Sequence, residues 1–497
     1  LMNEQGYISD AEYQEAVNTP LADTLDVQPI STGCMAADYD AGYFCDYVVH
    51  KILNSKEFGK TSEDREKLLK EGGLKIVTTL DIDANTLLNE TARNTIPPED
   101  SSGMEIVMAS VKPGTGEVLG FGLNRTYDAT EAAQNDQTRD SMNYAVDRED
   151  GGGMGFNVGS TWKPINMVAW MQKGHSINES LVTSTVYDTS KFNCNGYGFV
   201  GPWRVQNSGG GTTSPESPLQ GLIKSHNTTQ ASMASNIGLC AIADAAKEMG
   251  YHNAISNASD IYSANSFQPP MTIGTVQASP LTMANVYATM GANGVECTPI
   301  AITKVTDRSG SKVKVPSANC HQAIDPDIAQ TVSYALNQGV VQPGGEASTT
   351  QLDNNRKTFA KTGTNENTVM TTAGFVPNQV AAFVAVADAQ DPINNTFDNK
   401  TINGVYRPSW YGMYIATPAW KQFMNTYLAA INAPIDNDYG KGADKYTVSK
   451  GATRTYNQYQ YQRQQNSQQQ SQQQTNQGQQ QQSQQQPAEQ QSDQQHQ

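Results

Sequence analysis

The spacing of apolar positions changes several times along the first part of the chain. A short helical piece in residues 1–20 is followed by apolar and aromatic residues at helical spacing over 41–55. Runs rich in β-branched residues over 73–80, 105–111 and 117–121 predict strands, and a Lys-Pro-Gly turn joins the last two. This part of the chain therefore mixes short helices with strands.

The rest of the pattern is helical in the middle and returns to strands toward the end. Helices are predicted over residues 81–94, 160–173, 219–250, 281–290, 324–338 and 418–431. Strands are predicted over residues 300–305, 312–315, 358–364, 373–376 and 380–386. Strands at both ends with helices between them predict a mixed α/β (α+β) domain, in which helices cover an antiparallel sheet.

Composition divides the chain into regions. Because 497 residues exceed one ordinary core, we expect a packed domain over residues 101–438, preceded by a linker region over 21–100. A tail over 439–497 follows, and glutamine makes up more than half of it beyond Asn457. Such a tail has little apolar surface to bury and is predicted to be disordered. It is either a spacer, a self-associating segment or, as we favour, an inert low-complexity tail.

The bulk charge and hydropathy exclude some classes of protein. The formal net charge is -16 and no basic tract is present, which argues against a nucleic-acid partner. No apolar run approaches the roughly 20 residues that cross a bilayer, and the longest, residues 380–387, is strand-sized. No signal peptide is found, so we expect any membrane anchor or export signal to lie outside this chain or to be absent.

The six cysteines and six histidines show no metal-ligand spacing, so we predict neither a metal site nor a cofactor. Cys297 and Cys320 flank the predicted hairpin symmetrically about the turn at residues 307–310, as a cross-strand disulfide requires. Cys34 and Cys45 are close in sequence and form a second candidate pair. The alternative is six buried free thiols, as in an intracellular protein. We favour disulfides and an extracytoplasmic domain.

The candidate chemistry is centred on residues 159–164, where a glycine-rich loop meets an apolar helical pattern. Ser160 and Lys163 lie three residues apart and would share one face of a helix. A serine hydroxyl needs a nearby base, and a lysine can be that base if burial keeps its amine neutral. The spacing alone is weak evidence, because Ser309 and Lys312 match it by accident within a predicted turn.

Two further short motifs follow in the chain. Ser225 and Asn227 form a Ser-x-Asn motif, a pattern that also occurs by chance at Ser141, Ser176, Ser263 and Ser317. The sequence Lys361-Thr362-Gly363-Thr364 is more specific because it lies on a predicted strand, where its glycine would let a ligand approach the backbone. The order of these motifs after Ser160 and Lys163 is the strongest single signal in the sequence.

In this order the three motifs resemble those of the penicillin-recognising serine acyltransferases. The chain is most similar to the transpeptidase half of class A (bifunctional) penicillin-binding proteins, and the motif spacings suit that family better than class A β-lactamases. Five flanking stretches resemble the family as well: residues 73–81, 274–275, 279–289, 302–305 and 418–424. The resemblance implies the penicillin-binding transpeptidase or serine β-lactamase-like fold. It also implies that residues 1–20 are the end of a glycosyltransferase region, which is expected upstream with a membrane anchor.

The resemblance implies a role for each residue of the first two motifs. Ser160 would attack the carbonyl of a D-Ala-D-Ala stem peptide and become acylated, with Lys163 as its base. Ser225 would relay a proton to the leaving D-alanine. Asn227 would hold the Lys163 amine or the substrate amide. An amine from a second stem peptide would then resolve the acyl-enzyme into a cross-link, and a β-lactam would acylate Ser160 and stay.

The third motif would bind the substrate. Lys361 would supply positive charge beside Ser225, while Thr362 and Thr364 would bind the terminal carboxylate on either side of Gly363. The backbone N–H groups of Ser160 and Thr364 would form the oxyanion hole. Expected partners are donor and acceptor stem peptides, β-lactam antibiotics and the cell-wall synthesis machinery of the bacterial surface.

Some features leave alternatives open. Thr371 and Thr372 replace an aromatic pair that is usual after the third motif, and His226 points either into the cleft or away from it. A DD-carboxypeptidase or β-lactamase would need a positioned water, but only Glu179 and Glu216 lie between the first two motifs. A non-catalytic penicillin-binding sensor or scaffold is a further alternative, which the three intact motifs disfavour.

Overall fold

The computed structural model describes residues 1–20, 32–255, 260–263 and 266–448. The helices are α1 (Asp10–Asn18), α3 (Gly42–Asn54), α4 (Ser62–Glu71), α5 (Ile82–Thr95), α6 (Lys163–Gln172), α7 (Pro218–Ile223), α8 (Asn227–Ile237), α9 (Leu239–Glu248), α10 (Pro280–Gly291), α11 (Pro326–Val341), α12 (Ala416–Ala430) and α13 (Asp444–Thr447).

The longer strands are β1 (Lys75–Thr78), β2 (Glu105–Val111), β3 (Val118–Leu123), β11 (Ile302–Thr306), β14 (Phe359–Asn365), β15 (Val369–Val376) and β16 (Val380–Ala387). The short strands are β4 (Thr126–Tyr127), β5 (Arg139–Asp140), β6 (Phe156–Asn157), β7 (Val186–Asp188), β8 (Pro202–Arg204), β9 (Gln277–Ala278), β10 (Val295–Glu296), β12 (Lys312–Val313), β13 (His321–Gln322), β17 (Lys400–Ile402) and β18 (Val405–Arg407).

A five-stranded antiparallel sheet forms the centre of the molecule, in the order β14-β15-β16-β2-β3. Both of its faces are buried, which explains why its strands are apolar runs. Along β2, Val107 and Ala109 join one core cluster while Ile106 and Met108 join the other. This alternation is the two-residue period of a strand that is covered on both sides.

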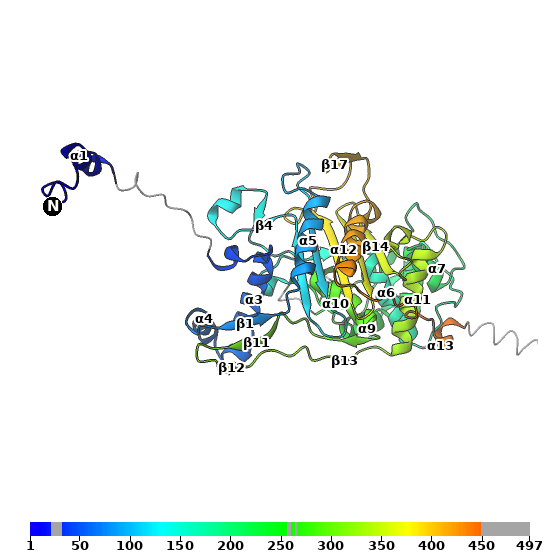
Figure 1. Cartoon of the computed structure of the whole chain (residues 1–497). Helices are drawn as coiled ribbons and strands as arrows, with labels where there is room; N and C mark the ends of the chain where they lie inside the picture. Colours follow the sequence, from blue (N-terminus) through cyan, green and yellow to red (C-terminus); the bar gives the residue numbers. More distant parts are fainter. Residues whose placement is uncertain (21–31, 256–259, 264–265, 449–497) are drawn as a thin grey trace, which may run out of the picture.

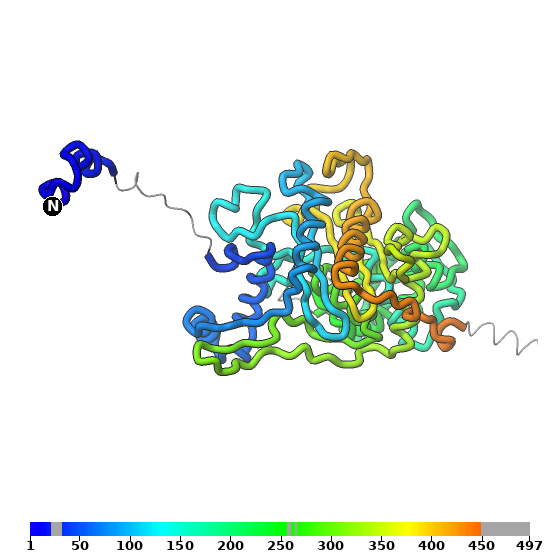
Figure 2. The backbone as a smooth tube through the Cα atoms, viewed as in Figure 1, coloured from blue at the N-terminus to red at the C-terminus, as the bar shows by residue number. Residues whose placement is uncertain are grey.

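Helices cover both faces of this sheet (Figure 1). On one face α5 and α12 pack together against the strands, and on the other α10 lies across β2, β15 and β16. Figure 2 shows that α12, near the end of the described chain, lies beside α5 from its first quarter. The predicted α+β architecture, with helices on an antiparallel sheet, is therefore confirmed.

The predicted hairpin belongs to a smaller sheet. β11 pairs with β12 through Val305 and Val313, as the turn between them predicts, and β1 completes the order β1-β11-β12. The strand predicted over residues 73–80 therefore lies outside the central sheet.

The ends of the packed region differ from the expected boundaries. Within residues 21–100, α3 buries Tyr47 and Ile52 in the core, so this region does not act only as a linker. At the other end Tyr439 and Tyr446 are also buried, and the folded part extends past the boundary expected at residue 438. The remainder of the glutamine-rich tail, residues 449–497, lies outside the described residues.

All six cysteines are paired in three disulfides. The predicted pairs Cys34–Cys45 and Cys297–Cys320 are confirmed. The third, Cys194–Cys240, was not predicted, and it joins the segment between β7 and β8 to the second residue of α9.

Candidate active site

Ser160 lies in a 3-10 turn, Gly159–Trp162, that runs directly into α6. The first turn of the predicted helix is therefore a 3-10 turn and not an α-helical one. Pro164 lies at the start of α6, where a backbone N–H would have no partner within the helix in any case. Ser160 is half-buried, and among the described residues its hydroxyl has no hydrogen-bond partner. The hydroxyl is thus held at the surface of a rigid turn and is free to react.

Glycines allow three segments to meet at this turn. Gly159 has φ +56°, in the left-handed region, and its N–H donates to the Gly274 carbonyl at 2.9 Å. A Cβ on Gly363 would lie 3.1 Å from the Val158 carbonyl and 3.2 Å from the Ser160 nitrogen. Gly363 therefore lets β14 approach the Ser160 turn itself, in addition to the ligand approach that the sequence suggested.

Replacing Gly274 by alanine is expected to lower the free energy of unfolding by about 3 kcal/mol. Gly274 has φ +91°, and a Cβ there would lie 1.8 Å from the backbone oxygen of Gly159. The matched control is Gly404→Ala, at φ +74° with no atom within 4 Å of the new Cβ, for which only about 1 kcal/mol is expected. Chemical denaturation measures both, and equal losses would contradict the backbone collision.

The Lys163 side chain, at the start of α6 directly after the Ser160 turn, is fully buried with 0% exposure. Its Nζ donates to the Ser225 carbonyl at 2.6 Å and to Asn227 Oδ1 at 2.7 Å. It also lies 3.2 Å from Ser225 Oγ. The structure therefore brings the predicted first and second motifs together around one amine.

This environment favours a neutral amine. Burial first, and then the positive charge of Lys361, lower the pKa of Lys163 well below its ordinary value, while Glu346 opposes the shift. A neutral amine has two N–H donors and one lone pair. The carbonyl and Oδ1 acceptors match the two donors, and the Ser225 hydroxyl can donate to the lone pair.

Ser225 sits between α7 and α8 in a strained conformation. Its φ is +55°, which is uncommon for a residue with a side chain and is often found at functional sites. Lys361 Nζ donates to Ser225 Oγ at 2.8 Å, so this hydroxyl can accept from one lysine and donate toward the other. Burial lowers the pKa of Lys361 to about 8, with Glu346 again opposing.

The third motif occupies β14, the edge strand of the central sheet, beside the Ser160 turn. Lys361 and Thr362 are buried, whereas Thr364 is half-buried and its Oγ1 accepts from the Gly412 N–H at 3.2 Å. The segment around Gly412 therefore forms the rim beyond Thr364. No local sequence pattern indicates this contact, because Thr364 and Gly412 lie far apart in the chain.

The threonines that replace the usual aromatic pair are both hydrogen-bonded. Thr371 donates to the Val158 carbonyl at 3.1 Å, which ties β15 to the Ser160 turn. Thr372 contacts the Thr417 hydroxyl at 2.9 Å on the opposite face of the sheet. The departure from the family pattern therefore leaves the packing of this region intact.

His226, Glu216 and Glu179, whose roles the sequence does not decide, form hydrogen bonds away from Ser160. His226 Nδ1 lies 2.8 Å from Glu216 Oε1, and Glu216 also accepts from the Thr229 hydroxyl. Glu179 lies 2.9 Å from His175. In the described chain neither carboxylate forms a hydrogen bond with Ser160, so neither is positioned to activate a water at that hydroxyl.

One contact to the second motif was missed by the sequence analysis. Asn227 Nδ2 donates to the Gln206 carbonyl at 3.0 Å, so its carboxamide is fixed between this carbonyl and Lys163. This contact could not be predicted, because every residue has a backbone carbonyl and the sequence of an irregular segment does not show where that carbonyl lies. Within the described part of the chain, no group of three metal-binding side chains and no helix long and apolar enough to cross a bilayer is present.

The site thus holds a free serine hydroxyl, a buried amine with a lowered pKa, a second hydroxyl and a second amine. This combination can activate a serine as a nucleophile and pass its proton onward. Ser160 occupies the second position of its turn, so its N–H is among those that lack a partner within the helix and can face a developing oxyanion.

Comparison with known proteins agrees with this geometry. A family model described as the penicillin binding protein transpeptidase domain matches residues 106–411. Penicillin-binding protein 1A of Clostridium acetobutylicum is 25% identical over 364 residues, which cover 70% of this chain and 41% of that protein. The chain therefore spans less than half the length of this relative.

Solved structures share the fold. The PonA1 protein of Mycobacterium tuberculosis, in complex with penicillin V, superposes with a TM-score of 0.61 and 18% identity, covering 81% of this chain and 98% of that one. Penicillin-binding protein 1A from Haemophilus influenzae gives a TM-score of 0.61 at 17% identity, covering 88% and 75%.

Proposed function

Because the chain belongs to the family of penicillin-binding protein transpeptidase domains, we propose that it is a serine-type peptidoglycan DD-transpeptidase. The observation that carries this proposal is the Lys163 amine, buried directly after the Ser160 turn and bonded to Ser225 and Asn227. Burial and the Lys361 charge lower the pKa of this amine well below its ordinary value, which favours the neutral base that a serine nucleophile requires.

In the first step the Ser160 hydroxyl gives its proton to Lys163 Nζ while Oγ attacks the carbonyl carbon of the penultimate D-alanine. The negative charge on the carbonyl oxygen is stabilised by the backbone N–H groups of Ser160 and Thr364. Collapse of this intermediate breaks the bond to the terminal D-alanine, whose nitrogen takes a proton from Lys163 through the Ser225 hydroxyl. An acyl ester on Ser160 remains.

In the second step an amine from a neighbouring stem peptide attacks the ester, loses a proton to the same relay and releases Ser160. The positive Lys361, with Thr362 and Thr364, holds the terminal carboxylate of the donor. A β-lactam would acylate Ser160 in the same way. Its leaving nitrogen stays tethered to the acyl group, so the acyl-enzyme persists.

The wider setting is also a proposal. Three disulfides are expected of a protein that folds outside the cytoplasm, where peptidoglycan is assembled. We place the chain in a class A protein that works with the cell-wall synthesis machinery at the bacterial surface, with a glycosyltransferase region and a membrane anchor upstream. Residues 21–100 would connect the two halves, and residues 101–438 would carry the catalytic motifs.

A partition experiment tests the proposed function. The protein is incubated with an acyl-D-Ala-D-Ala thioester analogue and increasing D-amino acid, and the transferred and hydrolysed products are quantified. Transfer that rises with acceptor, together with persistent labelling by fluorescent penicillin, supports the transpeptidase. Rapid loss of label with hydrolysis only would indicate a carboxypeptidase or β-lactamase, and the absence of any label would indicate a non-catalytic scaffold.

Penicillin acylation is expected to fall as pH rises through about 8. Lys361 carries its charge below its pKa of about 8 and loses it above, so the cation that attracts the ligand carboxylate disappears at alkaline pH. Burial and the Lys361 charge also lower the pKa of Lys163 well below its ordinary value. The second-order labelling rate from pH 6 to 10 measures this.

The control for this profile is Lys361→Arg, because a guanidinium stays charged over the whole range. Its labelling rate, although lower at neutral pH, is expected to stay flat up to pH 10. A wild-type rate that does not fall between pH 8 and 10 would contradict the assignment of Lys361.

A further inference from the structure

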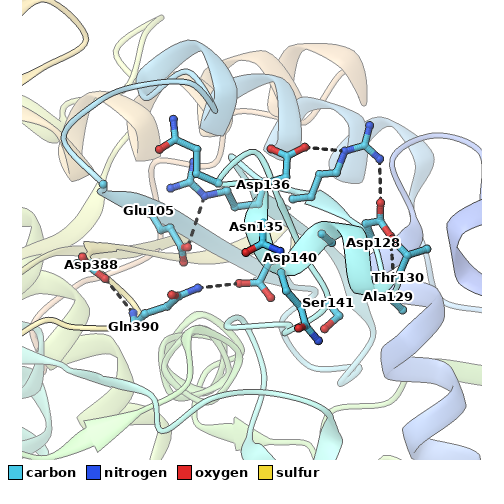
Figure 3. Close-up of a pocket in the computed structure, with 16 residues that line it drawn as sticks. Glu105, Asp128, Ala129, Thr130, Asn135, Asp136, Asp140, Ser141, Asp388 and Gln390 are labelled. Carbon is cyan, nitrogen blue, oxygen red and sulfur yellow. Dashed lines mark hydrogen bonds and ion pairs between the residues drawn. The ribbon is translucent and has the colours of Figure 1, made fainter.

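A cavity separate from the Ser160 site lies at the start of β2. In the central sheet, β2 is three strands away from β14, the edge strand beside the Ser160 turn. The volume of the cavity is about 630 Å³, within the usual range for small-molecule sites. Glu105, Asp140 and Asp388 lie around its inner end, with the Gln390 side chain between them (Figure 3). None of these residues takes part in the proposed acyl transfer.

The charged side chains that line this cavity are mostly acidic. There are five carboxylates and two guanidinium groups: Glu105, Asp128, Asp136, Asp140, Asp388, Arg125 and Arg139. Arg139 is already paired with Asp128 at 2.8 Å and with Asp136 at 3.2 Å. Only Arg125 is left to balance the other three carboxylates.

Glu105 is the most unusual of these groups because it is 5% exposed and incompletely bonded. Its Oε1 lies 3.5 Å from Arg125 Nε, at the outer limit of a hydrogen bond. Its Oε2 has no hydrogen-bond partner among the described residues. A buried carboxylate oxygen without a donor is costly, and native proteins seldom contain one.

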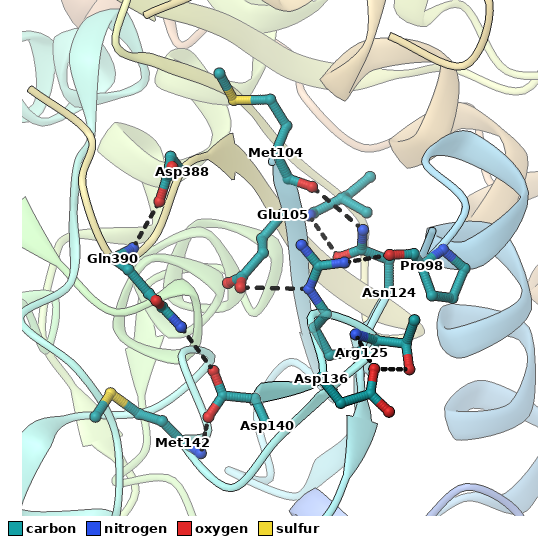
Figure 4. Close-up of polar contacts among 12 residues, drawn as sticks. Pro98, Met104, Glu105, Asn124, Arg125, Asp136, Asp140, Met142, Asp388 and Gln390 are labelled. Atoms are coloured by element: carbon teal, nitrogen blue, oxygen red, sulfur yellow. Dashed lines mark hydrogen bonds and ion pairs between the residues drawn. The ribbon is translucent and has the colours of Figure 1, made fainter. Parts of the chain in front are cut away.

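Arg125 is held away from closer pairing with Glu105. Its Nη1 donates to the Pro98 carbonyl at 2.6 Å, which directs part of the guanidinium out of the cavity (Figure 4). Burial raises the pKa of Glu105 to about 7, and the charges of Asp140 and Asp388 add to this rise while Arg125 opposes it. Arg125 therefore neutralises the negative charge of Glu105 only in part.

Lys400, which donates to Asn395 Oδ1, acts on Asp388 only from a distance, and no described cation lies within ion-pair distance of Asp140 or Asp388. They accept only amide donors: Gln390 Nε2 lies 3.4 Å from Asp140 Oδ2, and the Gln390 backbone N–H donates to Asp388 Oδ1 at 3.0 Å. These neutral contacts fix the two carboxylates in place without cancelling their charge. The inner end of the cavity is therefore preorganised and negative.

We propose that this cavity binds an organic ammonium ion, with the charged nitrogen on Glu105 Oε2 between Asp140 and Asp388. An ammonium group supplies up to three N–H donors, which matches an unbonded oxygen flanked by two further acceptors. A metal ion fits less well, because no group of three metal-binding side chains is present in the described residues.

The ligand's carbon chain would extend into a neighbouring cavity of about 790 Å³. The two cavities share Asp140 and Gln390 in their walls. The neighbouring cavity has apolar groups in its wall, including Phe156 and the exposed Ile393, beside polar ones such as Arg148, and it reaches Asn157, just before the Ser160 turn. Both a free diamine and an ammonium on a peptide side chain have this chemistry.

Isothermal titration of the full chain with three probes tests the proposal. Pentane-1,5-diamine represents the free source, Nα-acetyl-L-lysine amide represents the peptide source, and pentane-1,5-diol is the neutral control. We expect saturable binding of at least one amine that weakens with added salt, and none of the diol. The amine that binds more tightly identifies the source, and absence of binding by both amines overturns the proposal.

Glu105→Gln should weaken amine binding by about tenfold or more, since it removes the charge but keeps the shape. The matched control is Asp136→Asn, which also removes a carboxylate of the cavity, but one that Arg139 already neutralises. Its affinity should stay within about twofold of the wild type. Equal affinity of Glu105→Gln and the wild type would overturn the assignment of Glu105.

A measurement on the wild type makes the test independent of folding in the variants. Carbon-13 NMR of the glutamate carboxyl groups follows the Glu105 titration, whose pKa should fall when diamine is added. A titration unchanged by saturating diamine would place the amine elsewhere. The site does not rest on acyl transfer, so Glu105→Gln should leave penicillin labelling of Ser160 unchanged whether or not the proposed function holds.

Discussion

Ser160→Ala is expected to abolish covalent penicillin labelling, with a loss of acylation rate on the order of 10⁴-fold or more. In the proposed reaction the Ser160 hydroxyl forms the only bond that would hold the acyl group. Intact-mass measurement after incubation with penicillin gives the labelled fraction, and peptide mapping gives the labelled residue.

The chain contains its own control for this substitution. Ser309 and Lys312 repeat the same spacing in an exposed turn, where Ser309 is bonded only to neighbours in that turn. Ser309→Ala should label as the wild type does. A penicilloyl group that persists on Ser160→Ala would show that the nucleophile has been assigned to the wrong residue.

Lys163→Arg should lower the acylation rate by about 10³-fold, within the range for loss of a general base. The substitution keeps a long basic side chain at this position but removes the neutral amine, because a guanidinium does not lose its proton in this pH range. A merely structural or charge-balancing lysine would tolerate the change far better. The rate of penicillin labelling at neutral pH decides between these roles.

Two control measurements accompany the prediction for Lys163→Arg. Thermal unfolding of Lys163→Arg shows whether the buried site still folds, and Lys312→Arg provides the same substitution at the accidental match. If a folded Lys163→Arg protein acylates at the wild-type rate, another group must accept the Ser160 proton.

Much of the fold could be predicted because local signals agreed with the final packing. The apolar runs of β15 and β16 are buried on both faces, and the turn before β12 has the residues that a tight turn needs. Boundaries were less predictable. The Tyr446 carbonyl accepts from the Ser176 hydroxyl and from the Ile177 N–H, contacts that no pattern near residue 446 could reveal.

The candidate site was predicted through the order of three motifs, and the structure joins Lys163, Ser225 and Lys361 by hydrogen bonds. Their detailed arrangement was beyond the sequence. The left-handed backbone at Ser225 depends on how α7 and α8 meet, and serine itself gives no preference for it. The acidic cavity combines residues from β2, β5 and the end of β16, so no single stretch carried its signal.

Cys194 and Cys240 join the segment between β7 and β8 to α9, and the Gln206 carbonyl that fixes Asn227 lies just after β8. Asn207 strengthens the attachment by accepting from the Thr228 N–H at 3.1 Å. Oxidative folding therefore helps to set the geometry of the second motif. Material produced in a reducing cytosol would lack this cross-link and is expected to hold Asn227 less firmly, so recombinant production calls for periplasmic export or oxidative refolding.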